Sequence, residues 1–192
     1  MRTSTKTYVV KEHLQLASLA SGVRQEIVDV LPRLGSASVA QIAEALGRPA
    51  DALYYHLRAL QRVGLVVAAG DRKTGKRREA LFRAVSERME SQVEPRSPKR
   101  NQALTAIVGS MMRMGIRDYR RSIRRPDVVV SGPNRDLWAL RTTGWLTPAQ
   151  VAKVVRLIQR LLGEVSRSKG PGRLYAATLV FTPLDHRPRE RG

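Results

Sequence analysis

The chain has 192 residues, of which 42% are hydrophobic, and its 35 Lys and Arg residues against 16 Asp and Glu give a net charge of +19. This length suits one large or two small domains with a real core, and the charge favours a polyanionic partner such as nucleic acid. Without cysteine there can be no disulfide or thiolate site, and without a signal-peptide pattern or an apolar span of roughly 20 residues we expect a soluble cytoplasmic protein.

Two helices separated by a short turn are predicted early in the chain. The apolar spacing indicates a helix over residues 22–31, and we expect Pro32 to end it because proline lacks a backbone N–H. Ser38 and Gln41 have the form of a capping box, in which side chain and backbone satisfy each other at a helix start. The second helix therefore begins after Ser38, and it ends at Gly47 because glycine accepts the left-handed conformation.

A third helix over residues 49–63 completes a helix-turn-helix spacing made by Ala43, Gly47 and Leu53. Two helices that cross closely need a small residue at their contact, which Ala43 provides. The tight turn needs a residue that tolerates positive φ, which is Gly47. Leu53 anchors the third helix in the shared core, and Leu57 continues the same apolar side.

A β-hairpin is predicted after the third helix. Residues 65–70 and 79–85 are β-prone, and the charged segment 71–78 between them contains a glycine in a basic turn. Helices followed by a hairpin with a cationic tip, the wing, have the element order of a winged helix. We therefore predict a winged helix-turn-helix DNA-binding domain over residues 1–88, followed by a proline-containing linker over residues 89–101.

Residues 12–84 resemble the ArsR-like family of bacterial winged-helix transcription regulators. The resemblance is carried by ASLASGVRQEIVDVL (17–31), SVAQIAEALG (38–47) and LYYHLRALQRVGLV (53–66), the last of which looks like the family's recognition helix. It implies a DNA-binding repressor or activator, usually a homodimer on an inverted repeat. The second helix of the pair would enter the major groove, which admits one helix.

Some ArsR-like regulators sense metals through cysteine pairs, and this chain departs from them. It has no cysteine, and its histidines (His13, His56 and His186) follow no ligand spacing. We therefore expect no metal site and no cofactor. His56 flanks the leucines and is interpreted as a packed residue rather than a ligand.

Eleven side chains are predicted to bind DNA. A step of about 100° per residue from Leu53 places five of them opposite the leucines: Asp51, Tyr54, Tyr55, Arg58 and Arg62. Ser38 and Gln41 would lie near the DNA backbone, and the wing cations would contact flanking phosphates: Arg72, Lys73, Lys76 and Arg77.

Roles follow from the chemistry of each group. Arg58 can donate to a guanine edge, the tyrosines can bind phosphate or a thymine methyl, and Asp51 can accept from cytosine or merely cap its helix. Two plainer interpretations stay open: the arginine is simply solvated, or the tyrosines pack against the wing or a partner subunit.

The second half predicts a small α+β domain over residues 102–192 for dimerisation or effector sensing. A helix over residues 104–125 carries an apolar stripe and many arginines. It is either a dimer or interdomain helix with a solvated basic back, or a second surface for DNA or an anionic ligand. The stripe consists of Leu104, Val108, Met112, Ile116, Tyr119 and Ile123.

Strands are predicted on both sides of a further helix. They cover residues 127–130, 137–146 and 173–182, the last being apolar enough for burial on both faces. Thr147 and Gln150 form a second capping box before a helix with a broad buried face, which the glycines of residues 169–172 end.

The segments GWLTPAQV and GRLYAATLVFTPL are similar to C-terminal segments of some ArsR-like regulators. Trp138 and Trp145 in this half are either core residues or the lining of an effector pocket. Any small-molecule effector would be of unknown identity.

Three functions are weighed. A dimeric, sequence-specific transcription regulator that binds double-stranded DNA is favoured, and a non-specific architectural or RNA-binding protein is the alternative. An enzyme is not expected, because the sequence has no nucleophile–His–carboxylate set, paired acids or phosphate-binding glycine loop.

Overall fold

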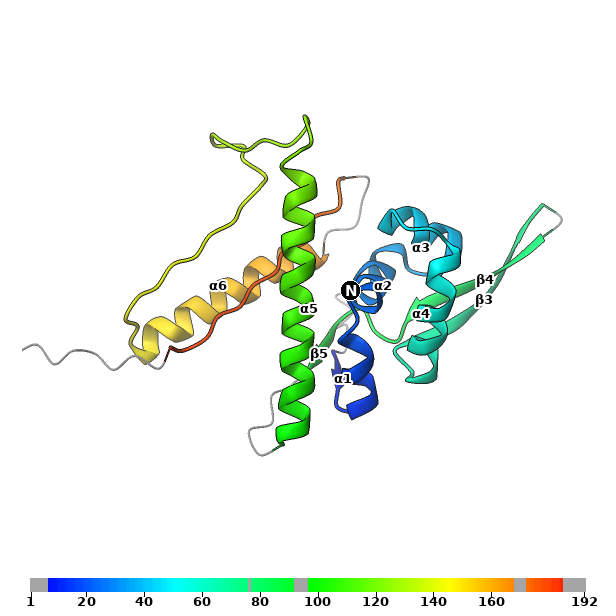
Figure 1. Ribbon diagram of the computed structural model, residues 1–192, viewed down its shortest axis with the longest axis horizontal. Coiled ribbons are helices and arrows are strands. Elements are labelled where there is room, and N and C mark those ends of the chain that lie inside the picture. Colours follow the sequence, from blue (N-terminus) through cyan, green and yellow to red (C-terminus); the bar gives the residue numbers. More distant parts are fainter. Residues whose placement is uncertain (1–6, 76, 92–96, 168–171, 185–192) are drawn as a thin grey trace, which may run out of the picture. The chain divides into compact units, whose positions relative to one another are not determined.

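The structure is a computed structural model that describes residues 7–75, 77–91, 97–167 and 172–184. Contacts within the chain divide it into two compact units, Met1–Arg117 and Asp118–Gly192. The first unit holds four short helices, two small sheets and most of the long helix α5 (Figure 1). The second holds the end of α5 and one further helix.

Four short helices form the body of the first unit. They are α1 (His13–Leu19), α2 (Gly22–Leu34), α3 (Val39–Leu46) and α4 (Asp51–Arg62). The predicted end of α2 at Pro32 is wrong, since the helix continues through this buried proline to Leu34. A proline in the last turn removes only one helical hydrogen bond, and burial of its ring offsets that loss.

Two small sheets accompany the helices. Strands β2 (Ala37–Ser38), β3 (Val66–Thr74) and β4 (Arg77–Ala84) form an antiparallel sheet in the order β2-β4-β3. Strands β1 (Tyr8–Val10) and β5 (Met89–Ser91) pair in parallel.

The predicted hairpin is confirmed, but its strands are longer than expected. Pairing continues to Thr74 opposite Arg77, so most of the segment predicted as a turn is strand. The chain reverses at Gly75, whose φ is +60°. The predicted linker 89–101 contains β5 and the start of α5, while residues 92–96 lie outside the described residues.

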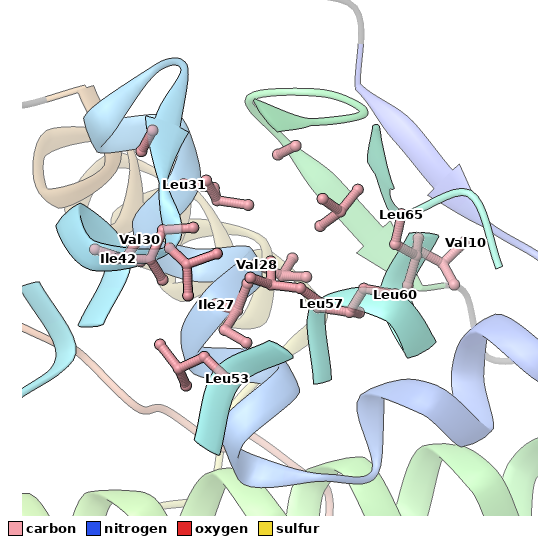
Figure 2. Packing of buried hydrophobic residues seen from close by; sticks show 14 of the residues in the cluster. Val10, Ile27, Val28, Val30, Leu31, Ile42, Leu53, Leu57, Leu60 and Leu65 are labelled. Atoms are coloured by element: carbon pink, nitrogen blue, oxygen red, sulfur yellow. The ribbon is translucent and has the colours of Figure 1, made fainter. Parts of the chain in front are cut away.

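One hydrophobic core holds the first unit together (Figure 2). Leu16, Ile27, Leu31, Ile42, Leu53, Leu57 and Leu60 from the four helices are fully buried, with Leu65 and Val66 from the start of the hairpin. Burial of each such side chain contributes roughly 1.5–3 kcal/mol. The core therefore fixes how α3, α4 and the base of the hairpin are arranged.

Helix α5 (Pro98–Ser122) packs its first half on the core. Ala103, Ile107 and Ser110 are its buried residues, and the buried Gln25 donates from Nε2 to the Ile107 carbonyl oxygen at 3.3 Å. A Cβ on Gly22 of α2 would lie only 3.3 Å from the Met114 sulfur. The absence of that Cβ lets α2 and α5 approach closely.

The predicted apolar stripe of α5 lies mostly on a different side from this contact. Val108, Met112, Ile116, Tyr119 and Ile123 are all exposed. The first unit covers the side defined by Ala103, Ile107 and Ser110 instead. Periodicity located an apolar face, but α5 is apolar on two sides and the spacing alone does not say which one α2 covers.

Among its described residues, the second unit has one helix of its own, α6 (Pro148–Arg167). Its predicted capping box is confirmed, because the Thr147 N–H donates to Gln150 Oε1 at 2.8 Å and the Gln150 N–H to Thr147 Oγ1 at 3.4 Å. The face of α6 that is predicted to be buried is mostly exposed in the single chain. The residues predicted to end it lie mainly outside the described residues.

The predicted C-terminal strands do not form in the described residues. Residues 127–130, 137–146 and 173–182 are irregular or extended without a ladder, and Figure 1 draws them without arrows. In the single chain, the described residues of this half therefore form one helix with long connections instead of the expected α+β arrangement. The physical reason is that a β-prone segment becomes a strand only when another strand pairs with it.

An exposed ion cluster ties two of these connections together. Asp127 pairs with Arg125 and Arg173, and the Tyr175 hydroxyl donates to Asp136 Oδ2 at 2.9 Å. The hydrogen bond from Arg125 is the main cause that lowers the pKa of Asp127 to about 2. The bond from Tyr175 is the main cause that lowers the pKa of Asp136. The beginning of segment 173–184 is thereby fixed beside residues 127–136.

Candidate nucleic-acid interface

The turn between α3 and α4 has the geometry that its sequence predicts. The Ser38 N–H donates to Gln41 Oε1 at 3.0 Å and the Gln41 N–H to Ser38 Oγ at 3.4 Å, which confirms the capping box. Gly47 ends α3 in the left-handed conformation, with φ +59° and ψ +42°. Ala43 is buried, and Leu53 is fully buried in the shared core. The spacing of these residues therefore sets the angle at which α4 leaves the turn.

Helix α4 has one buried and one exposed side. Leu53, Leu57 and Leu60 point into the core (Figure 2). The exposed side brings together all five predicted residues of this helix: Asp51, Tyr54, Tyr55, Arg58 and Arg62. Tyr54 is 50% and Tyr55 66% exposed, which is unusual for large aromatic side chains in a helix. This side is polar, partly cationic and open to a partner.

A shallow, open hollow lies on the second half of this side. It is lined by Tyr55, Arg58, Gln61 and Arg62. The Tyr55 ring contacts the His56 ring edge to face, with 5.4 Å between their centres. Burial lowers the pKa of His56, and the nearby Arg24 and Arg48 lower it further because they disfavour a second positive charge. His56 itself is half-buried.

The hairpin carries its cations on strands rather than in a loose turn. Arg72 pairs with Glu79 across the strands at 3.1 Å, and Lys73 lies opposite Arg78 in the register. Arg78 is exposed and is missing from the predicted set, because the sequence does not give the register that places it beside Lys73. Lys76 and the side chain of Arg77 lie outside the described residues.

The remaining two predicted residues lie at the start of α3. Ser38 is only 3% exposed, and its hydroxyl is engaged in the capping box. The Gln41 side chain is half-buried and engaged with Ser38. The structure thus gives both residues a capping role, and the accessible set is the exposed side of α4 together with the hairpin.

The Glu26 carboxylate forms ion pairs that hold the turn between α3 and α4 against α2 and α5, and these pairs were not predicted from the sequence. Glu26 of α2 accepts from Arg48, which follows Gly47, with 2.9 Å to Nε and 2.7 Å to Nη2. Its other oxygen pairs with Arg117 of α5. The three residues lie on separate elements and far apart along the chain, so no local pattern predicts their meeting. Together they connect α2, the turn and α5.

A family model described as a helix-turn-helix domain matches residues 19–67, a range that contains α2, α3 and α4. Residues 19–67 therefore have both the sequence pattern and the helix order of a helix-turn-helix domain. The match supports a DNA-binding regulator, in agreement with the exposed side of α4. No curated protein matches the chain.

The described residues also bear on three other expectations from the sequence, which concern a metal site, an effector site and a membrane span. They contain no group of three His, Asp or Glu side chains that could hold a metal ion. The candidate effector residues Trp138 and Trp145 are 58% and 70% exposed, so each is open to solvent in the single chain. None of the described helices is long and apolar enough to cross a membrane.

Proposed function

We propose that this protein is a sequence-specific transcription regulator of the ArsR-like winged helix-turn-helix type, acting in the cytoplasm as a homodimer on an inverted-repeat operator. The observation that carries the proposal is the exposed polar side of α4. The buried leucines on the opposite side fix the orientation of this helix, and a cationic hairpin follows it. In this proposal α4 enters the major groove and the hairpin acts as the wing against flanking phosphates. No catalytic role is assigned.

Arg58 is the proposed base-reading residue. A guanidinium can donate two hydrogen bonds to a guanine edge, and each such contact contributes roughly 1–3 kcal/mol of discrimination. Tyr54 and Tyr55 flank it and would contact phosphate oxygens or a thymine methyl group. The cations on the hairpin would add affinity that is independent of sequence and sensitive to salt.

Selection of bound duplexes from a random pool, with the full-length protein, tests the proposal. We expect an inverted repeat that binds roughly 10³-fold or more tightly than random DNA at the same salt concentration. An architectural protein, the alternative function, would show a steep salt dependence with no preferred sequence. That result would overturn the proposed regulator while keeping the nucleic-acid partner.

Substitution of Arg58 then tests whether this residue recognises a base. Arg58→Ala should weaken binding to the selected duplex by roughly 5- to 150-fold, the factor that matches 1–3 kcal/mol, and weaken random DNA much less. Arg88→Ala is the matched control, because it removes the same charge from an exposed residue outside α4 and the hairpin. Equal losses on both duplexes would place Arg58 on the DNA backbone.

A further inference from the structure

The described part of residues 118–192 has no hydrophobic core of its own. All the buried apolar side chains of the described residues lie between Val10 and Ile107. From Tyr119 to Leu184, by contrast, twenty large apolar side chains are more than a third exposed. At roughly 100 Å² each, they present on the order of 2,000 Å² of apolar surface, far more than a monomeric protein leaves open in one region.

Backbone groups in the same unit are also unpaired. Among the described residues, no backbone–backbone hydrogen bond involves residues 137–146 or 173–184. The second of these segments reads RLYAATLVFTPL, which is strongly β-prone. Extended segments with open N–H and C=O groups and apolar side chains are templates for pairing with another strand.

The start of this segment is nevertheless held in place. Arg173 pairs with Asp127, and the Tyr175 hydroxyl donates to Asp136. These contacts fix the entry to residues 173–184 while leaving Leu179, Val180 and Phe181 beyond it exposed. The segment is therefore fixed at one end, while its remaining residues have no backbone hydrogen-bond partners and expose apolar side chains.

Helix α5 carries a second open apolar surface, of which only the last residues belong to the second unit. Val108, Met112, Ile116, Tyr119 and Ile123 form one exposed stripe, which runs along α5 up to its end and includes its last residues in the second unit. On α6, Val151, Val155, Leu161 and Leu162 are exposed as well. Two amphipathic helices and two unpaired β-prone segments are the parts of a layered domain, without the contacts that would close it.

We propose that residues 118–192 complete their fold by intertwining with a second copy of this chain, whose extended segments pair with residues 173–184 as strands. The exposed sides of α6 and of the α5 stripe would then close a shared core between the two copies. This proposal specifies the interface of the dimer and does not depend on DNA binding.

The chemistry of the surface argues for a second copy. Each chain supplies both an unpaired strand and the apolar helices that would cover one, so a two-fold arrangement satisfies both copies with the same contacts. The exposed apolar area is well above the roughly 800 Å² per partner of a standard interface and falls in the obligate class. A small effector is too small to cover it, and a nucleic acid is too polar.

The two tryptophans provide a direct test, because both Trp138 and Trp145 lie in this unit. Tryptophan emission of the full-length protein without DNA therefore reports on residues 118–192 alone. We expect sedimentation to show a dimer at micromolar concentration, with blue-shifted emission that moves to the red as dilution dissociates it. A monomer with solvent-exposed tryptophan emission at every concentration would overturn the proposal.

Two substitutions locate the interface. Val180→Asp in segment 173–184 and Leu161→Asp on α6 should each shift the dimer dissociation constant at least tenfold and move the emission to the red. Arg160→Asp is the control, because it places the same side chain beside Leu161 at a polar position. A dimer that keeps its affinity and emission in both apolar variants would place the interface elsewhere.

These measurements keep the two proposals apart. A protein that dimerises as expected but selects no duplex would retain this inference and lose the proposed function. A variant that becomes monomeric should still give the far-UV signal of the first unit, because residues 1–117 have their own core. A variant that lost this signal as well would contradict the assignment of the interface to residues 118–192.

Discussion

Replacement of Glu26 by glutamine tests the brace behind the helix-turn-helix. The Glu26 carboxylate is 13% exposed and is shared by Arg48 and Arg117, whose side chains are 28% and 30% exposed. Glu26→Gln keeps the shape of the side chain but removes the charge that both arginines contact. The two guanidinium groups then lose their anionic partner at sites where water replaces it only in part.

The expected loss lies between two limits. Breaking a buried ion pair costs about 3–5 kcal/mol, and an exposed pair contributes about 0–1 kcal/mol. Because the carboxylate is nearly buried and the arginines are only partly so, we expect Glu26→Gln to lower the free energy of unfolding by about 1–3 kcal/mol. It should also weaken DNA binding, since Arg48 lies in the turn before α4.

Urea unfolding followed by far-UV circular dichroism measures this loss. Glu164→Gln is the matched control, because Glu164 pairs with Arg167 on α6 while both side chains are more than two-thirds exposed. The control should lose no more than about 0.5 kcal/mol, as exposed helix pairs do. Equal losses in the two variants would refute the reasoning that burial increases the contribution of the Glu26 carboxylate to the free energy of unfolding.

Two further substitutions address the helix-turn-helix itself. Leu57→Ala should lower the free energy of unfolding by about 2–5 kcal/mol, since Leu57 is 1% exposed in the core. Tyr55→Ala, on the opposite side of α4, should change it by about 0.5 kcal/mol or less. A similar loss in both variants would mean that α4 has no exposed side. Gly47→Ala should cost about 1–2 kcal/mol from its positive φ alone, because no atom lies within 4 Å of the position that its Cβ would take. Gly47→Asn should recover part of that loss in thermal unfolding, and no difference between the two variants would remove the backbone explanation.

Local chemistry made much of the first unit predictable from the sequence. The capping box of α3, the glycine at its end and the leucine side of α4 each depend on residues within one or two helical turns of one another, and so does the capping box of α6 in the second unit. The exposed side of α4 followed from the same periodicity. A helix-turn-helix is therefore recognisable from spacing because its geometry is set by a few neighbouring residues.

Features that depend on distant partners were not predictable. The register that pairs Lys73 with Arg78, the meeting of Glu26 with Arg117 and the side of α5 that packs on α2 all require knowledge of which elements meet. The second unit shows the same limit more strongly. Its β-prone segments were predicted to be strands, but no described segment of the chain pairs with them.

The length of the hairpin strands has a consequence for its charge. Neighbouring residues of a strand point to opposite faces, so Arg72 and Lys73 lie on opposite faces of the hairpin. On one face Arg72 is paired with Glu79. On the other face Lys73 lies directly opposite Arg78, and Asp71 is two residues away along the same strand. Like charges placed opposite each other repel, and a phosphate between them would relieve that repulsion. The pair of Lys73 and Arg78 is thus the part of the described hairpin where a bound phosphate would relieve the most repulsion between cations.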